Sequence, residues 1–146
     1  MSDFVFTAEG KSVSFSKTVA ESDVYLFAGI TGDFAPNHVD EEFMRHTQYG
    51  RRIAHGALLV GYMSRASSMM SELCVSPASR HFPVSLGYDR IRLLGAVFIG
   101  DTITVNYKMD SFDAAAMRSS ASIEVNNQHA KTVAVATHLM KWLEKS

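Results

Sequence analysis

The chain of 146 residues carries 14 basic and 15 acidic side chains, and its formal net charge is −1. Such a balance gives no large field of either sign, which argues against nucleic-acid or anionic-membrane partners, although local basic clusters remain compatible with it. The length fits one domain over residues 1–146, which would bury about two-thirds of its unfolded surface and form a core without disulfides or metal ions.

The single cysteine, Cys74, excludes an intramolecular disulfide, a thiolate zinc cluster and a Cys-x-x-Cys redox pair. We therefore expect a reducing, cytoplasmic setting. The segment Met1–Gly10 lacks a basic start and a long hydrophobic stretch, so no secretory signal is expected. The apolar run Ala57–Val60 is too short to span a bilayer.

The first elements are a short strand and a helix. Val13 and Phe15 alternate with serines, as in a strand. Thr18 and Glu21 match a capping box, which predicts a helix from about residue 19 to residue 30, and Gly32 supplies the backbone freedom that ends it. The core face of this helix is expected to contain three apolar residues: Val24, Phe27 and Ala28.

A loop and two further helices follow. Asp33–His38 is predicted to be a loop, because Asp40–Glu42 places carboxylates where a short helix would begin, just after His38. Ile53–Leu73 has no proline and predicts the longest helix. Its small residues fall on one stripe, which would let a curved sheet close tightly around it: Ala57, Val60, Gly61 and Ser64.

After Pro77 the pattern changes to the period-two alternation of strands. The strands are expected around residues 84–86, 99–107, 117–125 and 132–142, with Asn126-Asn127 as the turn between the last two. A helical half followed by an antiparallel meander predicts an α+β fold, in which one curved sheet packs on one long helix.

Asp33 and His38 lie five positions apart on the loop that Pro36 stiffens. An acid and an imidazole that bond the same water can remove and return a proton, which makes this pair a candidate for general acid–base catalysis. The alternative is that Asp33 is an ordinary turn residue that caps loop amides.

Three residues near the long helix are candidate substrate contacts. Gly56, at the expected start of the helix, would let a ligand approach free amides that favour negative charge, but close helix–strand packing explains a glycine there equally well. His55 could contact a ligand or be a structural residue. Ser64 could donate a hydrogen bond to substrate or fill a crowded contact.

Arginines form two pairs: Arg51 with Arg52 before the long helix, and Arg90 with Arg92 on one face of a strand. Their guanidinium groups could hold phosphates or a substrate carboxylate, with solvated surface charge as the alternative.

The remaining chemistries have weak support. His38, His46 and His55 are separated by intervals that do not match common zinc sites. Neither Ser64 nor Cys74 lies in a nucleophile elbow, and no glycine-rich phosphate loop follows a strand.

Taken together, the segments Phe27–Asp33, Pro36, His38, Arg52–Gly56 and Phe98–Thr102 resemble the MaoC-like, (R)-specific enoyl-CoA hydratase family, in the same order along nearly the whole chain. The resemblance implies a hotdog fold, a homodimer that joins two sheets, and reversible syn hydration of a trans-2-enoyl thioester. Coenzyme A is then part of the substrate, and no metal or redox cofactor is needed.

The resemblance also assigns roles to residues. Asp33 and His38 match the catalytic pair, Gly56 matches the amide that polarises the carbonyl, and Ser64 matches a serine of the substrate pocket. The family pattern reads Asp-x-Asn-Pro-x-His, whereas Ala35 stands here in place of its asparagine. The hydrogen bonding inside the loop is therefore expected to differ.

The sequence is compatible with two kinds of acyl group in the substrate. The amino-terminal half resembles hydratases of bacterial itaconate breakdown, whose dicarboxylic acyl-CoA could pair with an arginine such as Arg52 or Arg90. A straight-chain substrate such as crotonyl-CoA is equally compatible. The rival functions are a hotdog thioesterase, which would release free coenzyme A, and a non-catalytic acyl-CoA-binding module.

Overall fold

The structure is a computed structural model that describes residues 8–146. The expectation that Met1–Gly10 carries no signal lies, up to residue 7, outside the described residues. Within residues 8–146, none of the helices combines the length and the apolar character that a membrane crossing requires.

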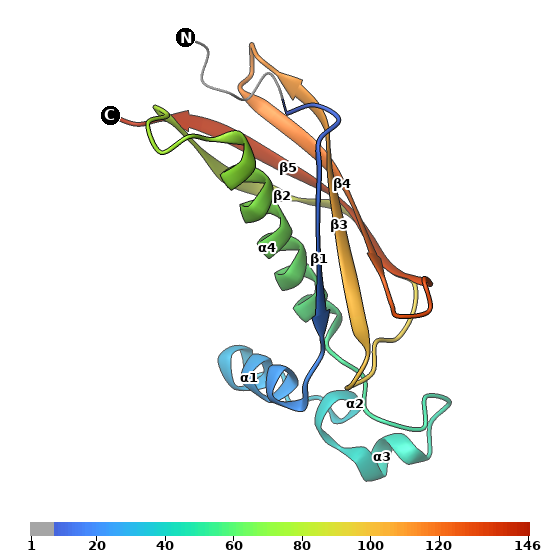
Figure 1. The fold of residues 1–146 in the computed structure, drawn as a ribbon. Coiled ribbons are helices and arrows are strands. Elements are labelled where there is room, and N and C mark those ends of the chain that lie inside the picture. The colour runs from blue at the N-terminus through green and yellow to red at the C-terminus, as the bar shows by residue number, and fades with distance from the viewer. Residues whose placement is uncertain (1–7) are drawn as a thin grey trace.

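Five antiparallel strands form one sheet in the order β1-β3-β4-β5-β2 (Figure 1). Their bounds are β1 Ser12–Thr18, β2 His81–Leu93, β3 Thr102–Asp113, β4 Arg118–Asn126 and β5 Thr132–Glu144. The predicted meander is confirmed, because β3, β4 and β5 pair in chain order. The turn at Asn126-Asn127 is also confirmed, with the Asn127 side chain accepting bonds from the amides of His129 and Lys131.

Four helices precede β2 along the chain: α1 Glu21–Thr31, α2 Pro36–Val39, α3 Glu41–Arg45 and α4 Gly56–Cys74. Figure 1 shows the long helix α4 lying along the sheet and the three short helices gathered at one end of the molecule. The first turn of α4 points towards that end, so the loop Asp33–His38 and the start of α4 belong to the same region. This is the predicted α+β arrangement.

The core lies between α4 and the sheet. Side chains at every second position of β3 are buried, as a strand with one face on the core requires. The buried residues from α4 and β3 are mostly large and apolar: Leu59, Met63, Ala66, Met70, Ile103, Val105, Tyr107 and Met109.

The small stripe of α4 lies at the margin of the contact between helix and sheet and is mostly exposed, so the expectation that the sheet closes tightly around it is wrong. Ala57, Gly61 and Ser64 are exposed, and Val60 is only half-buried. The face that the sheet covers contains the larger side chains, because Leu and Met bury more apolar area than Ala, Gly and Ser. The spacing in the sequence predicted this stripe but not its position relative to the sheet.

The start of α1 also differs from the prediction. Thr18 is the last residue of β1, and its hydroxyl bonds that of Thr102 across the sheet instead of capping a helix. The Asp23 carboxylate accepts the Ala20 amide at 2.8 Å and so supports the first turn of α1. Gly32 ends α1 with φ 80°, as predicted.

A buried polar cluster interrupts the core between β5 and its neighbours. His138 is 1% exposed, with Nε2 2.8 Å from the Ser85 hydroxyl and Nδ1 2.9 Å from the Tyr107 hydroxyl. The Tyr88 ring stacks on the imidazole at 4.3 Å. Burial lowers the pKa of His138 to about 4, so the imidazole is neutral at neutral pH.

This neutral histidine predicts a pH dependence of stability. Between about pH 6.5 and pH 4 the unfolded chain binds a proton at this position that the folded chain does not, so stability falls as pH falls through this window. His138→Gln should remove a component on the order of 2 kcal/mol from the pH dependence of the free energy of unfolding. Denaturant titrations at several pH values measure it, with the exposed His129→Gln as the matched control. Equal pH dependence in wild type and His138→Gln would contradict the prediction.

Candidate active site

The loop after α1 presents the two predicted catalytic side chains. Gly32 turns the chain out of the helix, and the Asp33 carboxylate accepts the Ala35 amide at 3.3 Å. Pro36 then opens the one-turn helix α2, because its fixed φ suits a first helical position. His38 lies inside this turn rather than before a helix, which corrects the predicted loop boundary.

Two histidines from different segments clamp this loop against the start of α4. His38 Nδ1 lies 2.8 Å from the Ile53 carbonyl oxygen, and His55 Nε2 lies 2.9 Å from the Asp33 carbonyl oxygen. The two imidazole rings stack with their centroids 3.8 Å apart. Each histidine therefore holds the backbone of the segment that carries the other.

These bonds fix which ring nitrogens carry protons. A carbonyl oxygen only accepts, so His38 Nδ1 must be the donor, and Nε2 of a neutral ring keeps its lone pair. The carboxylate of Asp33 and one ring nitrogen each of His38 and His55 lie within 4.8 Å of one another. The structure thus brings the acid and the imidazole together with a free proton acceptor on the histidine.

The segment that leads into α4 is itself anchored to the sheet. The Ala54 amide donates to the Val97 carbonyl at 2.7 Å, and Ile53 forms an isolated bridge with Phe98. Asp101 stabilises this turn, since its carboxylate accepts the Phe98 amide at 2.9 Å. The Phe98–Thr102 motif therefore acts as a structural support for the site.

A cavity of about 370 Å³ connects His38 with the first turn of α4. It is lined by His38 and Gly56, among others, and by Leu93 at the end of β2. The first amides of an α-helix have no partner within the helix, so the start of α4 offers donors to a ligand in this cavity. A negative charge that develops there is favoured by the helix dipole.

Gly56 also has the packing role that was its alternative explanation. A Cβ at this position would lie 2.2 Å from Leu93 Cδ1, so a side chain there would force Leu93, which lines the cavity, to move. The two explanations are compatible, because close approach of α4 to β2 shapes the same cavity that receives the amide.

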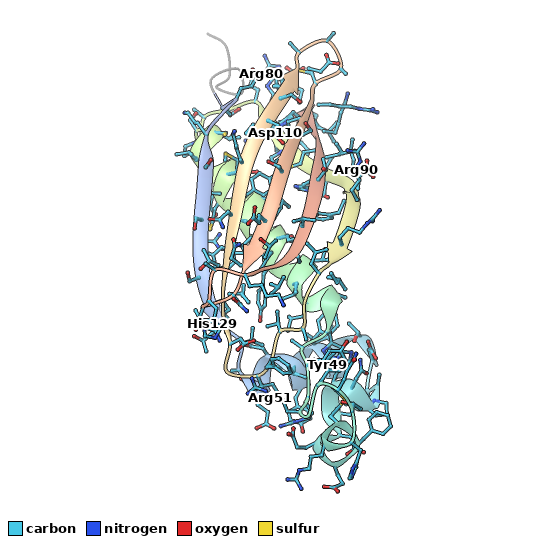
Figure 2. All side chains as sticks on the ribbon, turned by 90° about the vertical axis from the view of Figure 1, so that its right-hand side faces the viewer. Tyr49, Arg51, Arg80, Arg90, Asp110 and His129 are labelled. Atoms are coloured by element: carbon cyan, nitrogen blue, oxygen red, sulfur yellow. The ribbon has the colours of Figure 1, made fainter. Side chains whose placement is uncertain are left out.

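The predicted arginines lie in different surroundings. The Arg52 guanidinium bonds Glu21 at 2.7 Å and Glu41 at 2.8 Å, and these bonds raise its pKa. It joins α1 to α3 and has little capacity left for a substrate. Arg90 lines a separate hollow of about 550 Å³ together with Lys108, Glu124 and others. Figure 2 shows Arg90 on the sheet, far from Arg51 and Tyr49.

Ser64 and His46 lie outside the clamp. Ser64 is exposed on α4 and lines a second cavity further along that helix. His46 Nε2 lies 3.4 Å from the Glu42 carboxylate on the surface. Of the three histidines considered for a metal, the structure brings together His38 and His55 but not His46.

A basic hollow adjoins the cavity, and of its two cations the sequence singled out Arg51 but not Lys131. The hollow has a volume of about 500 Å³ and shares Tyr49 and Leu94–Ala96 with the cavity at Gly56. Its cationic lining is Arg51 and Lys131, with His129 beside them. Arg51 stacks over the Phe98 ring at 4.1 Å, and Figure 2 places Arg51 and Tyr49 at the end of the molecule where the short helices lie.

The cluster of Asp33, His38 and His55 has the composition of a metal site but not its geometry. A metal ion binds imidazole through an in-plane lone pair at about 2.0–2.1 Å. The two rings are stacked at an interplanar angle of 26°, so their in-plane lone pairs do not converge on one point at that distance. We therefore expect Asp33, His38 and His55 to act through hydrogen bonds and proton transfer and not as metal ligands.

Comparison with known proteins identifies the class. Residues 5–133 match the family model of the MaoC-like domain. An (R)-specific enoyl-CoA hydratase of Rhodospirillum rubrum is 38% identical over 96 residues, which cover 66% of this chain and 61% of that protein. The chain belongs to the MaoC-like domain family.

Solved structures agree with this assignment. A monoamine oxidase regulatory protein from Archaeoglobus superposes with a TM-score of 0.82 at 29% identity, covering 99% of this chain and 95% of the other. An R-hydratase from Pseudomonas aeruginosa gives a TM-score of 0.80 at 25% identity and covers 98% and 86%. The expected hotdog fold is confirmed.

The ring geometry leads to a prediction about metal removal. Dialysis against EDTA should leave the rate of a reaction catalysed at this cluster unchanged, because the stacked histidines do not present converging ligands. Rate measurements before and after dialysis, with metal content determined by mass spectrometry, check it. A loss of activity that added Zn²⁺ or Mn²⁺ restores would contradict the prediction.

Proposed function

We propose that the protein catalyses reversible hydration of a short-chain trans-2-enoyl-CoA to an (R)-3-hydroxyacyl-CoA. One observation carries this proposal. The Asp33 carboxylate and the His38 imidazole lie within 4.8 Å of each other, and His38 also lines the cavity at the amide end of α4. Hydration of an activated double bond needs this set: a proton acceptor, a proton donor and a site for an oxyanion.

In the proposed reaction, the thioester oxygen accepts the Gly56 amide, and Asp33 and His38 bind one water above C3. Nε2 of His38 is placed to take a proton because Nδ1 is committed to the Ile53 carbonyl. The water oxygen attacks C3, and electron density moves through the C2–C3 bond onto the thioester oxygen. The pair returns the proton to C2, which restores the carbonyl.

The names of relatives support this reaction class. The R. rubrum relative is described as an (R)-specific enoyl-CoA hydratase, and the solved P. aeruginosa protein is described as an R-hydratase. Asp33 and His38 lie in register with the pattern on which the resemblance was based. Placing the thioester carbonyl at Gly56 is consistent with the helix dipole, which stabilises negative charge at that end.

Replacement of the pair tests the proposed mechanism. Asp33→Asn and His38→Ala should each lower kcat for crotonyl-CoA by about 10²–10⁴-fold, because each removes one partner of the proton transfer. Loss of the enoyl-thioester absorbance measures the rate. The exposed residues Asp40 and His46 provide controls, and Asp40→Asn and His46→Ala should stay within about threefold of wild type.

The same assay separates the rival functions. A thioesterase would release free thiol from crotonyl-CoA, and a binding module would bind the thioester without changing its absorbance. Near-native rates in Asp33→Asn and His38→Ala, with circular dichroism showing intact folds, would overturn the mechanism.

The basic hollow is our candidate for the coenzyme A arm. Its shared lining with the cavity at Gly56 gives a continuous path from the thioester to Arg51 and Lys131. Cations suit the phosphates of coenzyme A. Arg52, held by Glu21 and Glu41, contributes to the structure of the loop instead.

The adjacent arginines should therefore behave differently. Arg51→Ala and Lys131→Ala should each raise KM for crotonyl-CoA about three- to tenfold with little change in kcat, and more so at low salt. Arg52→Ala should instead lower thermal stability. Steady-state kinetics and thermal melts measure the two effects, and an unchanged KM in both Arg51→Ala and Lys131→Ala would exclude this hollow as the phosphate site.

We also propose that two copies join through β2. This strand pairs only with β5 within the described sheet, so one of its edges has no strand partner there. Leu86 and Leu93 of this strand and Leu94 just after it are exposed, and an edge of this kind favours pairing with a second chain. Sedimentation equilibrium should give twice the mass of 16.1 kDa, and a monomer at micromolar concentration would contradict the proposal.

A further inference from the structure

His55 lies next to the proposed catalytic pair, but the proposed reaction gives it no role. The sequence made it a candidate substrate contact, yet it is not among the described residues that line the cavity at Gly56. Its side chain is buried, with 1% of the residue exposed. Any effect of His55 on a substrate in that cavity must therefore pass through the residues that it contacts.

One nitrogen of His55 holds the main chain of Asp33. Nε2 lies 2.9 Å from the Asp33 carbonyl oxygen, and it must be the donor because a carbonyl oxygen only accepts. Residues 31–34 are all exposed, so packing does little to fix this stretch of the chain. Its other hydrogen bonds reach no further than four residues, such as that from the Asp33 amide to the Thr31 hydroxyl at 3.2 Å. The bond from His55 is thus the link between this stretch and the start of α4.

The other nitrogen of His55 has no comparable use. Nδ1 is buried and has no hydrogen-bond partner within residues 8–146. A buried acceptor without a partner costs free energy, and most buried polar atoms in proteins have one. A proton on Nδ1 would find no acceptor either. The structure therefore uses a single N–H of this imidazole, the one that Asp33 accepts.

His38 touches the same imidazole but does not depend on it. The two rings stack with their centroids 3.8 Å apart. His38 has two anchors of its own, since Nδ1 bonds the Ile53 carbonyl at 2.8 Å and the amide donates to the Ala35 carbonyl at 2.9 Å. It is also buried, at 8% exposed. Of the two catalytic candidates, Asp33 is therefore the one whose position depends on His55.

We propose that His55 is a positioning residue of the hydratase, and that its Nε2–H keeps the Asp33 carboxylate within reach of the water that His38 binds. This inference rests on the proposed function, because it gives His55 a part in the same reaction. The carboxylate and one nitrogen of each imidazole lie within 4.8 Å of one another. A displacement of about 1 Å in such a group can lower the rate about 10²-fold.

Two substitutions of His55 separate its donor from its ring. Glutamine places an amide N–H near the position of Nε2 but has no ring, whereas phenylalanine has a ring but no donor. His55→Phe should lower kcat for crotonyl-CoA about 10²-fold and change KM less than about threefold, because the carboxylate is misplaced while the thioester contacts remain. His55→Gln should lower kcat less than about tenfold. Loss of the enoyl-thioester absorbance measures both.

A double-mutant cycle tests whether His55 acts through Asp33. In the Asp33→Asn background, His55→Phe should lower kcat less than about threefold further, because the carboxylate that it positions is already absent. An effect on the neighbouring Gly56 amide, or a general loss of stability, would persist in both backgrounds. His46 is exposed and pairs with Glu42, so His46→Gln and His46→Phe serve as controls and should stay within about threefold of wild type.

An NMR measurement on the wild-type protein does not depend on any variant. Long-range proton–nitrogen correlation spectra show which ring nitrogen of each histidine carries a proton, and His55 should carry it on Nε2. Circular dichroism should show that the His55 variants are folded, and His55→Leu, which also has no donor, replaces His55→Phe if that variant is not.

Three results would overturn the inference. The first is an equal kcat in the glutamine variant and in the variant without a donor. The second is a loss in that variant that is as large in the Asp33→Asn background as in the wild type. The third is an NMR spectrum that places the proton of His55 on Nδ1.

The proposed function is judged by the wild-type protein alone. If it hydrates crotonyl-CoA but the His55 variants give one of these results, the hydratase stands and the role of His55 fails. If the wild-type protein hydrates no thioester, the proposed function fails and this inference fails with it.

Discussion

The candidate site depends on the reciprocal hydrogen bonds of His38 and His55. Each imidazole donates to a carbonyl in the segment that carries the other, and the two rings stack between these bonds. The Ile53 amide adds a third link by donating to the Asn37 carbonyl at 3.0 Å. Loop and helix start are thereby held in one geometry, because three short bonds and a ring contact leave the loop little freedom to reorient Asp33.

The two histidines of this clamp differ in burial and in their hydrogen-bond partners. His55 is 1% exposed, and its ring centroid lies 4.6 Å from that of Phe27. Its Nε2 donates a hydrogen bond to the Asp33 carbonyl oxygen. His38 lines the cavity and keeps an unprotonated nitrogen available. The hydrogen-bond partner of each ring nitrogen therefore distinguishes two imidazoles that the sequence alone does not.

Residues around the site also differ in role although they are neighbours in the sequence. Arg51 and Arg52 are adjacent, yet Arg52 is enclosed by two carboxylates while Arg51 lines the basic hollow. Along α4, the sheet covers the large apolar side chains, and the serines line a cavity next to β2. One helix therefore contributes large apolar side chains to the core and presents serines outside it.

The sequence alone predicted most of the helices and strands and singled out Asp33 and His38 as the candidate pair. Period-two and period-3.6 patterns predicted the strands and α4, because burial of one face requires them. Gly32, Pro36 and the spacing of Asp33 and His38 predicted a pre-ordered loop, since their backbone restrictions are local. Only the tertiary structure decided which face of α4 is inside, that Thr18 serves a strand, and which arginine is free. These outcomes depend on residues distant in the chain, such as Thr102, Glu21 and Leu93, whose proximity no local pattern encodes.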